Sequence, residues 1–139
     1  MRIREADVRA AVVGSLAAQG FRTEIEFPLL GRIADVLALK DEAACVAVEC
    51  KERDWRRGVK QARVYQVACE FVYLALPAGR TSDIGTAFLL EQSLGLLEVT
   101  SDGRVTEVVA PRQAPHFLPE LKERMVARLE EQSTIAEAE

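Results

Sequence analysis

Two carboxylates and one lysine stand in two consecutive apolar segments of the chain. Asp35 lies in the segment 32–39, and Glu49 and Lys51 close the segment 44–51. A short polar link joins the segments, which predicts two antiparallel strands lying side by side. Residues two apart in a strand point to the same face, so Glu49 and Lys51 share one face. The three side chains therefore converge at the open end of a hairpin, where they suit the joint binding of a divalent cation and a phosphate group.

Each of these residues also has a plainer interpretation. An unpaired aspartate is costly to bury in an apolar strand, so a ligand role for Asp35 is favoured over a cap or a salt bridge. Val46 and Val48 point away from the face of Glu49, toward a core, which argues against a merely solvated role for Glu49. Lys51 alone would suit a solvated strand end paired with a glutamate, but its position two residues after Glu49 favours a functional role.

Hydrophobic periodicity predicts the elements that position these groups. Helices are expected at 4–19, 54–69, 83–92 and from Pro119 onward. Strands are expected at 21–27, 32–39, 44–51, 71–76, 95–99 and 104–110. The first strand is expected to place Phe21, Thr23, Ile25 and Phe27 on one face. This order predicts an α/β fold with a mixed central sheet flanked by helices, forming one domain over 1–133, followed by a frayed acidic tail at 134–139.

Ala34-Asp35 and Glu49-Cys50-Lys51 resemble the motif of the PD-(D/E)xK nuclease superfamily, whose restriction-endonuclease-like folds include the archaeal Holliday junction resolvases. The resemblance covers residues 1–77. Ala34 stands where the motif has its proline, which is not a ligand. The resemblance implies a restriction-endonuclease-like α-β-β-β-α-β core, to which this chain would add a C-terminal hairpin and helix.

The resemblance also implies a chemistry, the metal-dependent hydrolysis of DNA phosphodiester bonds by an endonuclease of repair, recombination or defence. Asp35 and Glu49 would bind Mg²⁺ or Mn²⁺, together with the backbone carbonyl of Cys50. Lys51 would hold the attacking water near phosphorus and offset charge on the phosphate. The partner would be DNA, and many such nucleases cut duplex DNA as homodimers. Duplex, branched and single-stranded DNA, and RNA, all stay open as substrates.

The resemblance further implies a supporting acid and a glutamine. Many members direct a glutamine at the active site from the helix after the ExK strand, so Gln61 is a candidate to orient the water. Tyr65, one turn later, is expected to pack. The candidates for the supporting acid lie on the first strand or the first helix and are Glu24, Glu26, Glu5 and Asp7. Glu24 is preferred and Glu5 is second, although each of the four, taken alone, is also compatible with an ordinary surface acid.

A dense group of basic residues follows the candidate site directly. Its members are Arg53, Arg56, Arg57, Lys60 and Arg63. Against a formal net charge of −4, this local concentration favours contact with the DNA backbone over an ordinary solvated helix face. Trp55 within the group would either stack on an unpaired base or anchor the helix.

Rare residues and hydropathy exclude several classes of function. A single histidine, His116, excludes HNH-type nucleases, two-histidine zinc hydrolases and histidine phosphodiesterases. The cysteines, Cys45, Cys50 and Cys69, form no CxxC pair and are expected to be free thiols in a reducing compartment. No apolar run approaches the roughly 20 residues that span a bilayer, and the charged N-terminus lacks a signal-peptide core. We therefore expect a cytoplasmic protein without a membrane partner.

Two other functions stay open. A non-catalytic domain of the same fold would bind DNA or serve as an assembly subunit, although an idle site has no reason to hold three charges together. Alternatively, the motif is coincidental in an unrelated α/β domain that binds a small molecule, but the sequence has neither GxGxxG nor GxxxxGK[ST]. The C-terminal stripe of Leu121, Met125 and Leu129 is expected to pack in the core, with a dimer helix as the alternative.

Overall fold

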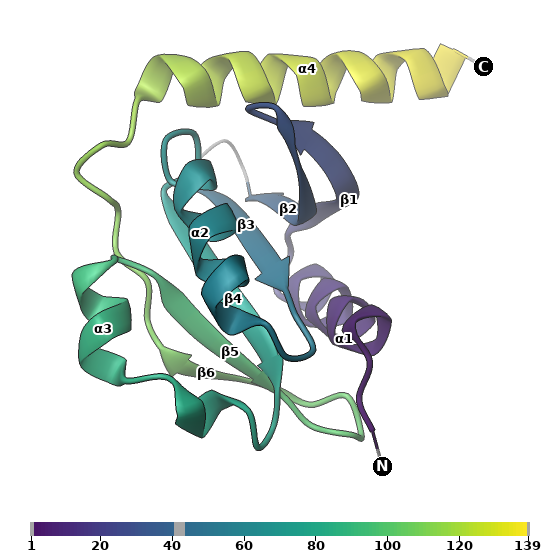
Figure 1. Cartoon of the computed structure of the whole chain (residues 1–139). Coiled ribbons are helices and arrows are strands. Elements are labelled where there is room, and N and C mark those ends of the chain that lie inside the picture. Colours follow the sequence, from purple (N-terminus) through teal and green to yellow (C-terminus); the bar gives the residue numbers. More distant parts are fainter. Residues whose placement is uncertain (1, 41–43, 139) are drawn as a thin grey trace.

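The computed structural model describes residues 2–40 and 44–138, with side chains up to residue 132, and is built around a mixed β-sheet (Figure 1). In chain order the elements are α1 (Glu5–Ala18), β1 (Arg22–Leu29), β2 (Arg32–Lys40), β3 (Ala44–Cys50), α2 (Trp55–Tyr65), β4 (Phe71–Pro77), the 3₁₀ turn η1 (Thr81–Asp83), α3 (Thr86–Glu91), β5 (Gly95–Val99), β6 (Val105–Val109) and α4 (Pro119–Ala138).

The order of strands in the sheet repeats the order of the chain, from β1 to β6. The β3–β4 and β4–β5 pairs are parallel, and the other pairs are antiparallel. In Figure 1, α1 lies behind the sheet, α2 lies in front of it, and α4 crosses its upper end. The predicted fold class, a mixed sheet flanked by helices, is confirmed. The order of the first elements, α-β-β-β-α-β, is consistent with a restriction-endonuclease-like core.

Both faces of the central strands are buried. Tyr65 of α2 belongs to a large apolar cluster on one face, together with Met125 and Leu129 of α4. Val46 and Val48 belong to a second cluster on the other face, where α1 packs. The continuous apolar runs of β3 and β4 are thus those of strands covered on both sides. The predicted core role of the α4 stripe is confirmed for Met125 and Leu129.

The alternation of side chains along β2 shifts at Asp35. Ala34 and Leu37 both lie in the cluster under α2, although they are three residues apart, while Val36 lies in the cluster under α1. Asp35 itself takes part in neither of the ladders that pair β2 with its neighbours. The strand therefore turns locally at the one acidic residue in its interior.

A matching irregularity in β1 overturns one prediction. Glu26, which lies across from the shifted residue of β2, has a φ of +50°, a region that non-glycine residues rarely adopt. The expected shared face of Phe21, Thr23, Ile25 and Phe27 is therefore wrong. Phe27 is buried in the cluster under α2, whereas Phe21 packs against the cluster under α1. The left-handed residue between them changes the face to which the strand points its side chains.

Two predicted helices are shorter than expected. The helix predicted to reach residue 69 ends at Tyr65, because the N–H groups of Ala68 and Cys69 both turn back to donate to the Tyr65 carbonyl. The helix predicted at 83–92 is divided into η1 and α3, since Gly85 between them has an extended backbone. Both corrections concern helix ends, where local hydrogen bonds outweigh hydrophobic periodicity.

Two further expectations concern the margins of the described residues. The polar link predicted at 40–42 lies outside them from residue 41 onward. The backbone of α4 continues through Ala138, so the segment 134–138 is helical, and the fraying of these turns stays a prediction. No helix in the described ranges combines the length and the apolarity needed to cross a membrane.

Candidate active site

Asp35 and Glu49 lie next to each other on neighbouring strands, as the hairpin predicts. The β2–β3 ladder pairs Val36 with Val48, and Asp35 and Glu49 are the next residues in the same register. The Asp35 Oδ2 atom accepts a hydrogen bond from the backbone N–H of Cys50 at 2.8 Å. This bond fixes the aspartate across the strand end, so the two acids meet where the pairing of β2 and β3 stops.

Glu49 is a buried carboxylate with one unpaired oxygen. Its side chain is 2% exposed, and its Oε1 lies 3.9 Å from Lys51 Nζ, while Oε2 has no hydrogen-bond partner among the described residues. Burial is the main reason that the pKa of Glu49 rises to about 8, and the charge of Asp35 adds to the shift. Lys51 and Tyr65 favour the charged form but do not offset burial. Without a ligand, Glu49 is therefore largely neutral at pH 7.

Lys51 lies directly beneath α2. Its side chain is 16% exposed, and its backbone N–H donates to the Ala75 carbonyl at 3.0 Å. Gly58 of α2 is buried above it, and a Cβ at Gly58 would lie 2.9 Å from Lys51 Cγ and 2.6 Å from Leu74 Cδ1. Only a residue without a side chain lets α2 rest on the stem of the lysine. Sequence analysis missed this residue, and its signal was a glycine kept inside a predicted helix at a cost of about 1 kcal/mol.

Gly58→Ala is expected to destabilise the protein. The added methyl group must displace Leu74 or Lys51, and overpacking of this kind costs about 1–3 kcal/mol, more than the gain from removing a helical glycine. Urea unfolding measures the change. Gly14→Ala is the matched control, because a Cβ at Gly14 in α1 meets nothing within 4 Å and should stabilise by up to about 1 kcal/mol. Equal effects of the two changes would contradict the packing role of Gly58.

Gln61 and Tyr65 share the face of α2 that covers Glu49. Tyr65 is fully buried and its hydroxyl donates to the Ile33 carbonyl at 3.0 Å. Burial, and then the charge of Glu49, raise the pKa of Tyr65. Gln61 lies one turn earlier and carries a buried Oε1 without a partner in the described part of the chain. Tyr65 therefore packs, as expected, and also lies beside the carboxylate, while Gln61 offers an unused acceptor.

Three of the four candidates for the supporting acid have other partners. Glu24, the preferred candidate, pairs with Arg22 at 3.4 Å. Glu26 pairs with Arg9 at 3.0 Å, and the Asp7 carboxylate accepts from a backbone N–H at the start of α1. The geometry therefore does not support the preference for Glu24.

Glu5 is the candidate that shares a cavity with Asp35. This small cavity, of about 90 Å³, is lined by Glu5, Ala6, Arg9, Asp35 and Cys50. It lies between the start of α1 and the end of the hairpin, so the second-ranked acid has the better position. The order of preference drawn from the sequence could not take account of this position, because the distance between a helix and a strand far along the chain is set by packing.

The residues present fit a hard divalent cation. In the described ranges, no three His, Cys, Asp or Glu side chains gather into a group that could hold a metal by themselves. Two carboxylates, however, are what Mg²⁺ takes when it keeps several waters, and Asp35 and Glu49 supply them. The adjacent Cys50 thiol is buried, and burial raises its pKa, which disfavours the thiolate that zinc would need.

His116, Cys45 and Cys69 are not among the residues that form the site. His116 lies in a loop, with Nε2 3.5 Å from the Arg63 carbonyl. Cys45, Cys50 and Cys69 are free, as expected. All three are also buried, and the sulfurs of Cys45 and Cys69 lie 3.1 Å apart.

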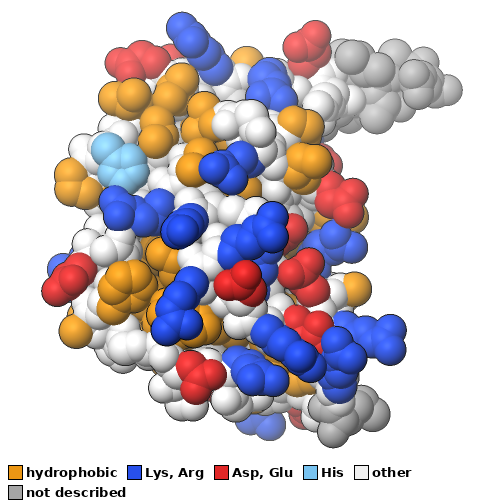
Figure 2. Space-filling view, in the orientation of Figure 1, with side chains coloured by type: hydrophobic (Ala, Val, Ile, Leu, Met, Phe, Trp, Pro, Cys, Tyr) orange, Lys and Arg blue, Asp and Glu red, His pale blue; other side chains and the backbone are white. Residues whose placement is uncertain are grey.

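Basic side chains gather on the face of the molecule that carries α2, as Figure 2 shows. All members of the predicted basic group are exposed: Arg53, Arg56, Arg57, Lys60 and Arg63. The Arg56 guanidinium lies 4.4 Å from the centroid of the Trp55 ring. The rings of Trp55 and Phe88 pack in a T-shaped arrangement with their centroids 6.1 Å apart. These contacts favour the anchoring role of Trp55, and DNA contact by the basic group stays a prediction.

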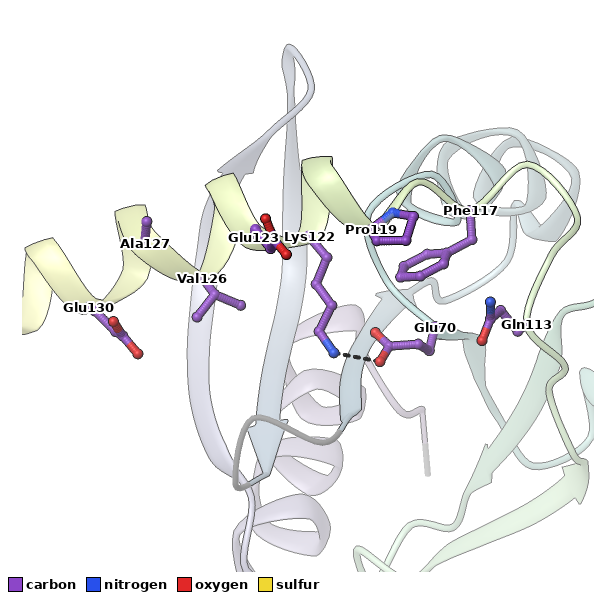
Figure 3. Close-up of a pocket in the computed structure, with 9 residues that line it drawn as sticks. All are labelled: Glu70, Gln113, Phe117, Pro119, Lys122, Glu123, Val126, Ala127 and Glu130. Atoms are coloured by element: carbon purple, nitrogen blue, oxygen red, sulfur yellow. Dashed lines mark hydrogen bonds and ion pairs between the residues drawn. The ribbon is translucent and has the colours of Figure 1, made fainter.

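A larger cavity lies beneath α4, at the end of the strands opposite to the candidate active site (Figure 3). It measures about 560 Å³, and its lining includes Phe117, Lys122 and Val126. Lys122 Nζ lies 2.5 Å from Glu70 Oε2, just before β4 begins. The strands β3 and β4 are parallel. Glu70 directly precedes β4 and Glu49 lies at the end of β3, so the length of a strand separates this cavity from the candidate active site.

Comparison with known proteins bears on the fold. No family model matches the chain, and no curated protein matches it significantly. The SPO1766 protein of unknown function from Silicibacter pomeroyi has a TM-score of 0.70 and 22% identity, over 98% of this chain and 90% of that one. A repair endonuclease from Pyrococcus abyssi has a TM-score of 0.52 and 18% identity, over 72% of this chain. The fold is shared with an endonuclease. The match spans 48% of that chain, and at these identities the likeness concerns the fold alone.

Proposed function

We propose that the protein is a Mg²⁺- or Mn²⁺-dependent nuclease of the PD-(D/E)xK type, which hydrolyses DNA phosphodiester bonds. The observation that carries the proposal is the state of Glu49, buried beside Asp35 with one oxygen unpaired and Lys51 3.9 Å from the other. Buried polar groups are almost always hydrogen-bonded unless a ligand completes them. A carboxylate kept only for stability would have both oxygens satisfied.

Asp35, Glu49 and the Cys50 carbonyl would hold the metal ion. Once bound, the ion would lower the pKa of a water molecule and offset negative charge on the phosphate. The hydrogen bond from the Cys50 N–H orients Asp35 before any ligand arrives. Glu5, on the far side of the cavity that Asp35 lines, would orient a water in the outer shell.

Lys51 would bind a phosphate oxygen and the attacking water. Its charge is mostly shielded from solvent, so its attraction for the developing negative charge on the phosphate is stronger than in water. Gln61 would accept a hydrogen bond from the same water through its unpaired Oε1. Water would then attack phosphorus in line with the departing oxygen of the strand.

Metal affinity is expected to rise with pH as Glu49 loses its proton. Below pH 8 the carboxylate is mostly protonated, since its pKa is about 8, and a cation must displace that proton. Affinity for Mn²⁺ or Mg²⁺ should increase about tenfold per pH unit up to pH 8 and then level off. Calorimetry in two buffers of different ionisation enthalpy measures the proton released. An affinity that is the same at pH 6 and pH 8 would show that Glu49 is not a ligand.

Cleavage is the direct test of the proposed function. The protein is incubated with duplex, branched and single-stranded DNA, and with RNA, in Mg²⁺, Mn²⁺ or EDTA. We expect cleavage of at least one DNA in the presence of metal, none in EDTA, and none with Asp35→Asn. DNA binding without cleavage under every condition would instead support the non-catalytic alternative.

A further inference from the structure

Another cavity opens near the ends of β3 and β4, where the candidate active site also lies. It measures about 350 Å³, and its lining includes Arg2, Glu52, Arg53, Pro77 and Arg80. The cavity joins three parts of the chain: the residues before α1, the segment after β3 and the turn after β4.

The charges in this cavity do not balance. Arg2 donates to both oxygens of Glu52, from Nε at 2.5 Å and from Nη2 at 3.2 Å, and this contact lowers the pKa of Glu52. The guanidinium groups of Arg53 and Arg80 make no hydrogen bond or ion pair within the described ranges. Glu52 is thus the one carboxylate in the lining beside three arginines. Two positive charges, those of Arg53 and Arg80, remain for a ligand.

Two guanidinium groups over a cavity suit a phosphate. Each presents a planar fork of N–H donors that matches two phosphate oxygens. The cavity is several times larger than the ~30 Å³ share of a water molecule in the liquid, so a phosphate group fits with some of its water. An uncharged or cationic ligand would leave the arginines repelling each other.

The cavity is close to the candidate active site along the chain. Arg53 follows Lys51 by two residues, so their Cα atoms are at most about 7 Å apart. Arg80 follows the end of β4, which runs parallel to β3 and beside it, and so reaches the same edge of the sheet. Successive nucleotides of a strand in B-form DNA are about 3.4 Å apart along the helix axis, so a neighbouring nucleotide would lie within this reach.

We infer that the cavity binds a second phosphate of the substrate strand, one or two nucleotides from the phosphate held at Lys51. The inference rests on the proposed nuclease function and adds the direction in which the strand crosses the site. Two fixed phosphates define that direction, whereas one leaves the strand free to rotate. The second phosphate lies either within the strand or at its 5′ end.

The test is DNA binding in EDTA, where cleavage does not contribute. Fluorescence anisotropy with labelled oligonucleotides compares the wild type with Arg53→Gln/Arg80→Gln. We expect about tenfold weaker binding by the double variant, and a slope of log affinity against log salt that is smaller by about 0.7 for single strands or 0.9 for duplex. Arg124→Gln, which removes one positive charge at an exposed site on α4, is the control and should leave both values unchanged.

The position of the phosphate is found by neutralising one phosphate at a time as a methylphosphonate. At the phosphate that the cavity binds, the neutral group should weaken binding by the wild type but not by the double variant. If instead the wild type prefers 5′-phosphorylated over unphosphorylated oligonucleotides and the double variant does not, the phosphate bound in the cavity is the one at the 5′ end. Both outcomes support the inference.

Failure of the inference is distinct from failure of the proposed function. Suppose that the wild type cleaves DNA and that the double variant binds DNA as tightly as Arg124→Gln does. If the effects of the arginine substitutions and of each methylphosphonate are also additive, the cavity is not a phosphate site. If the double variant shows the expected loss but no protein cleaves DNA, the phosphate site stands and the nuclease proposal falls. The absence of DNA binding by the wild type would overturn the inference.

Discussion

Glu49→Gln is expected to abolish cleavage and, at the same time, to stabilise the metal-free protein at alkaline pH. Glutamine keeps the shape of the side chain but removes the charge that would bind the metal. Loss of a group of this kind costs at least about 10²–10³ in rate. The same change removes a carboxylate that is costly to ionise where it is buried, which is the source of the added stability.

The pH dependence of this stability has a definite sign. The pKa of Glu49 is about 8 in the folded protein and near 4.5 when the side chain is exposed. Between these values the folded state holds a proton that the unfolded state has released, so this group lowers the free energy of unfolding by about 1.4 kcal/mol for each pH unit. Its stabilising contribution is complete below pH 4.5 and lost by pH 8. The free energies of unfolding of the wild type and the variant should therefore be similar near pH 5 and differ by several kcal/mol at pH 8.

Urea unfolding in EDTA at pH 5 and pH 8 measures this difference. Glu91→Gln, an exposed position on α3, is the control and should change stability little at either pH. A variant of Glu49 that is destabilised at pH 8 would show that its carboxylate is held as a satisfied anion, and that outcome would remove the main support for a metal site.

Lys51→Met is expected to lower the rate of the chemical step about 10²–10³-fold and to weaken DNA binding far less. Methionine keeps the aliphatic stem on which Gly58 rests but removes the ammonium group beside Glu49. Because that group lies largely buried, it acts on the phosphate undergoing attack rather than on the strand as a whole. Single-turnover cleavage at saturating protein measures the effect.

Lys60→Met provides the matched comparison, because Lys60 is an exposed lysine on α2. We expect it to weaken DNA binding and reduce its salt dependence while the chemical rate stays close to wild type. If both substitutions altered only affinity, Lys51 would be one more backbone contact and not part of the chemistry.

Local patterns predicted the elements that carry the acidic pair. Alternation and the short link between two apolar runs were enough to bring Asp35 next to Glu49, since register in a hairpin is set by nearby residues. The same reasoning failed at Glu26. Its left-handed backbone reverses the faces of β1, and no pattern of apolar residues encodes such a turn.

Features that depend on packing between distant elements could not be predicted. The place of Glu5 in the cavity beside Asp35 follows from the way α1 crosses the sheet. The requirement for glycine at position 58 follows from the closeness of α2 to Lys51 and Leu74. The pairing of Arg2 with Glu52 joins residues fifty positions apart, and sequence alone gives no measure of that distance.

The match between strand order and chain order has a consequence for how the molecule forms. Each strand pairs with the next one made, so most of the sheet closes over short loops, which favours rapid folding. The hairpin that joins Asp35 to Glu49 needs only β2 and β3. The last helix arrives late and packs Met125 against Cys69, with the sulfurs 4.0 Å apart. During synthesis, which proceeds at about 5–20 residues per second, we expect the acidic pair to come together before the ribosome has completed α4.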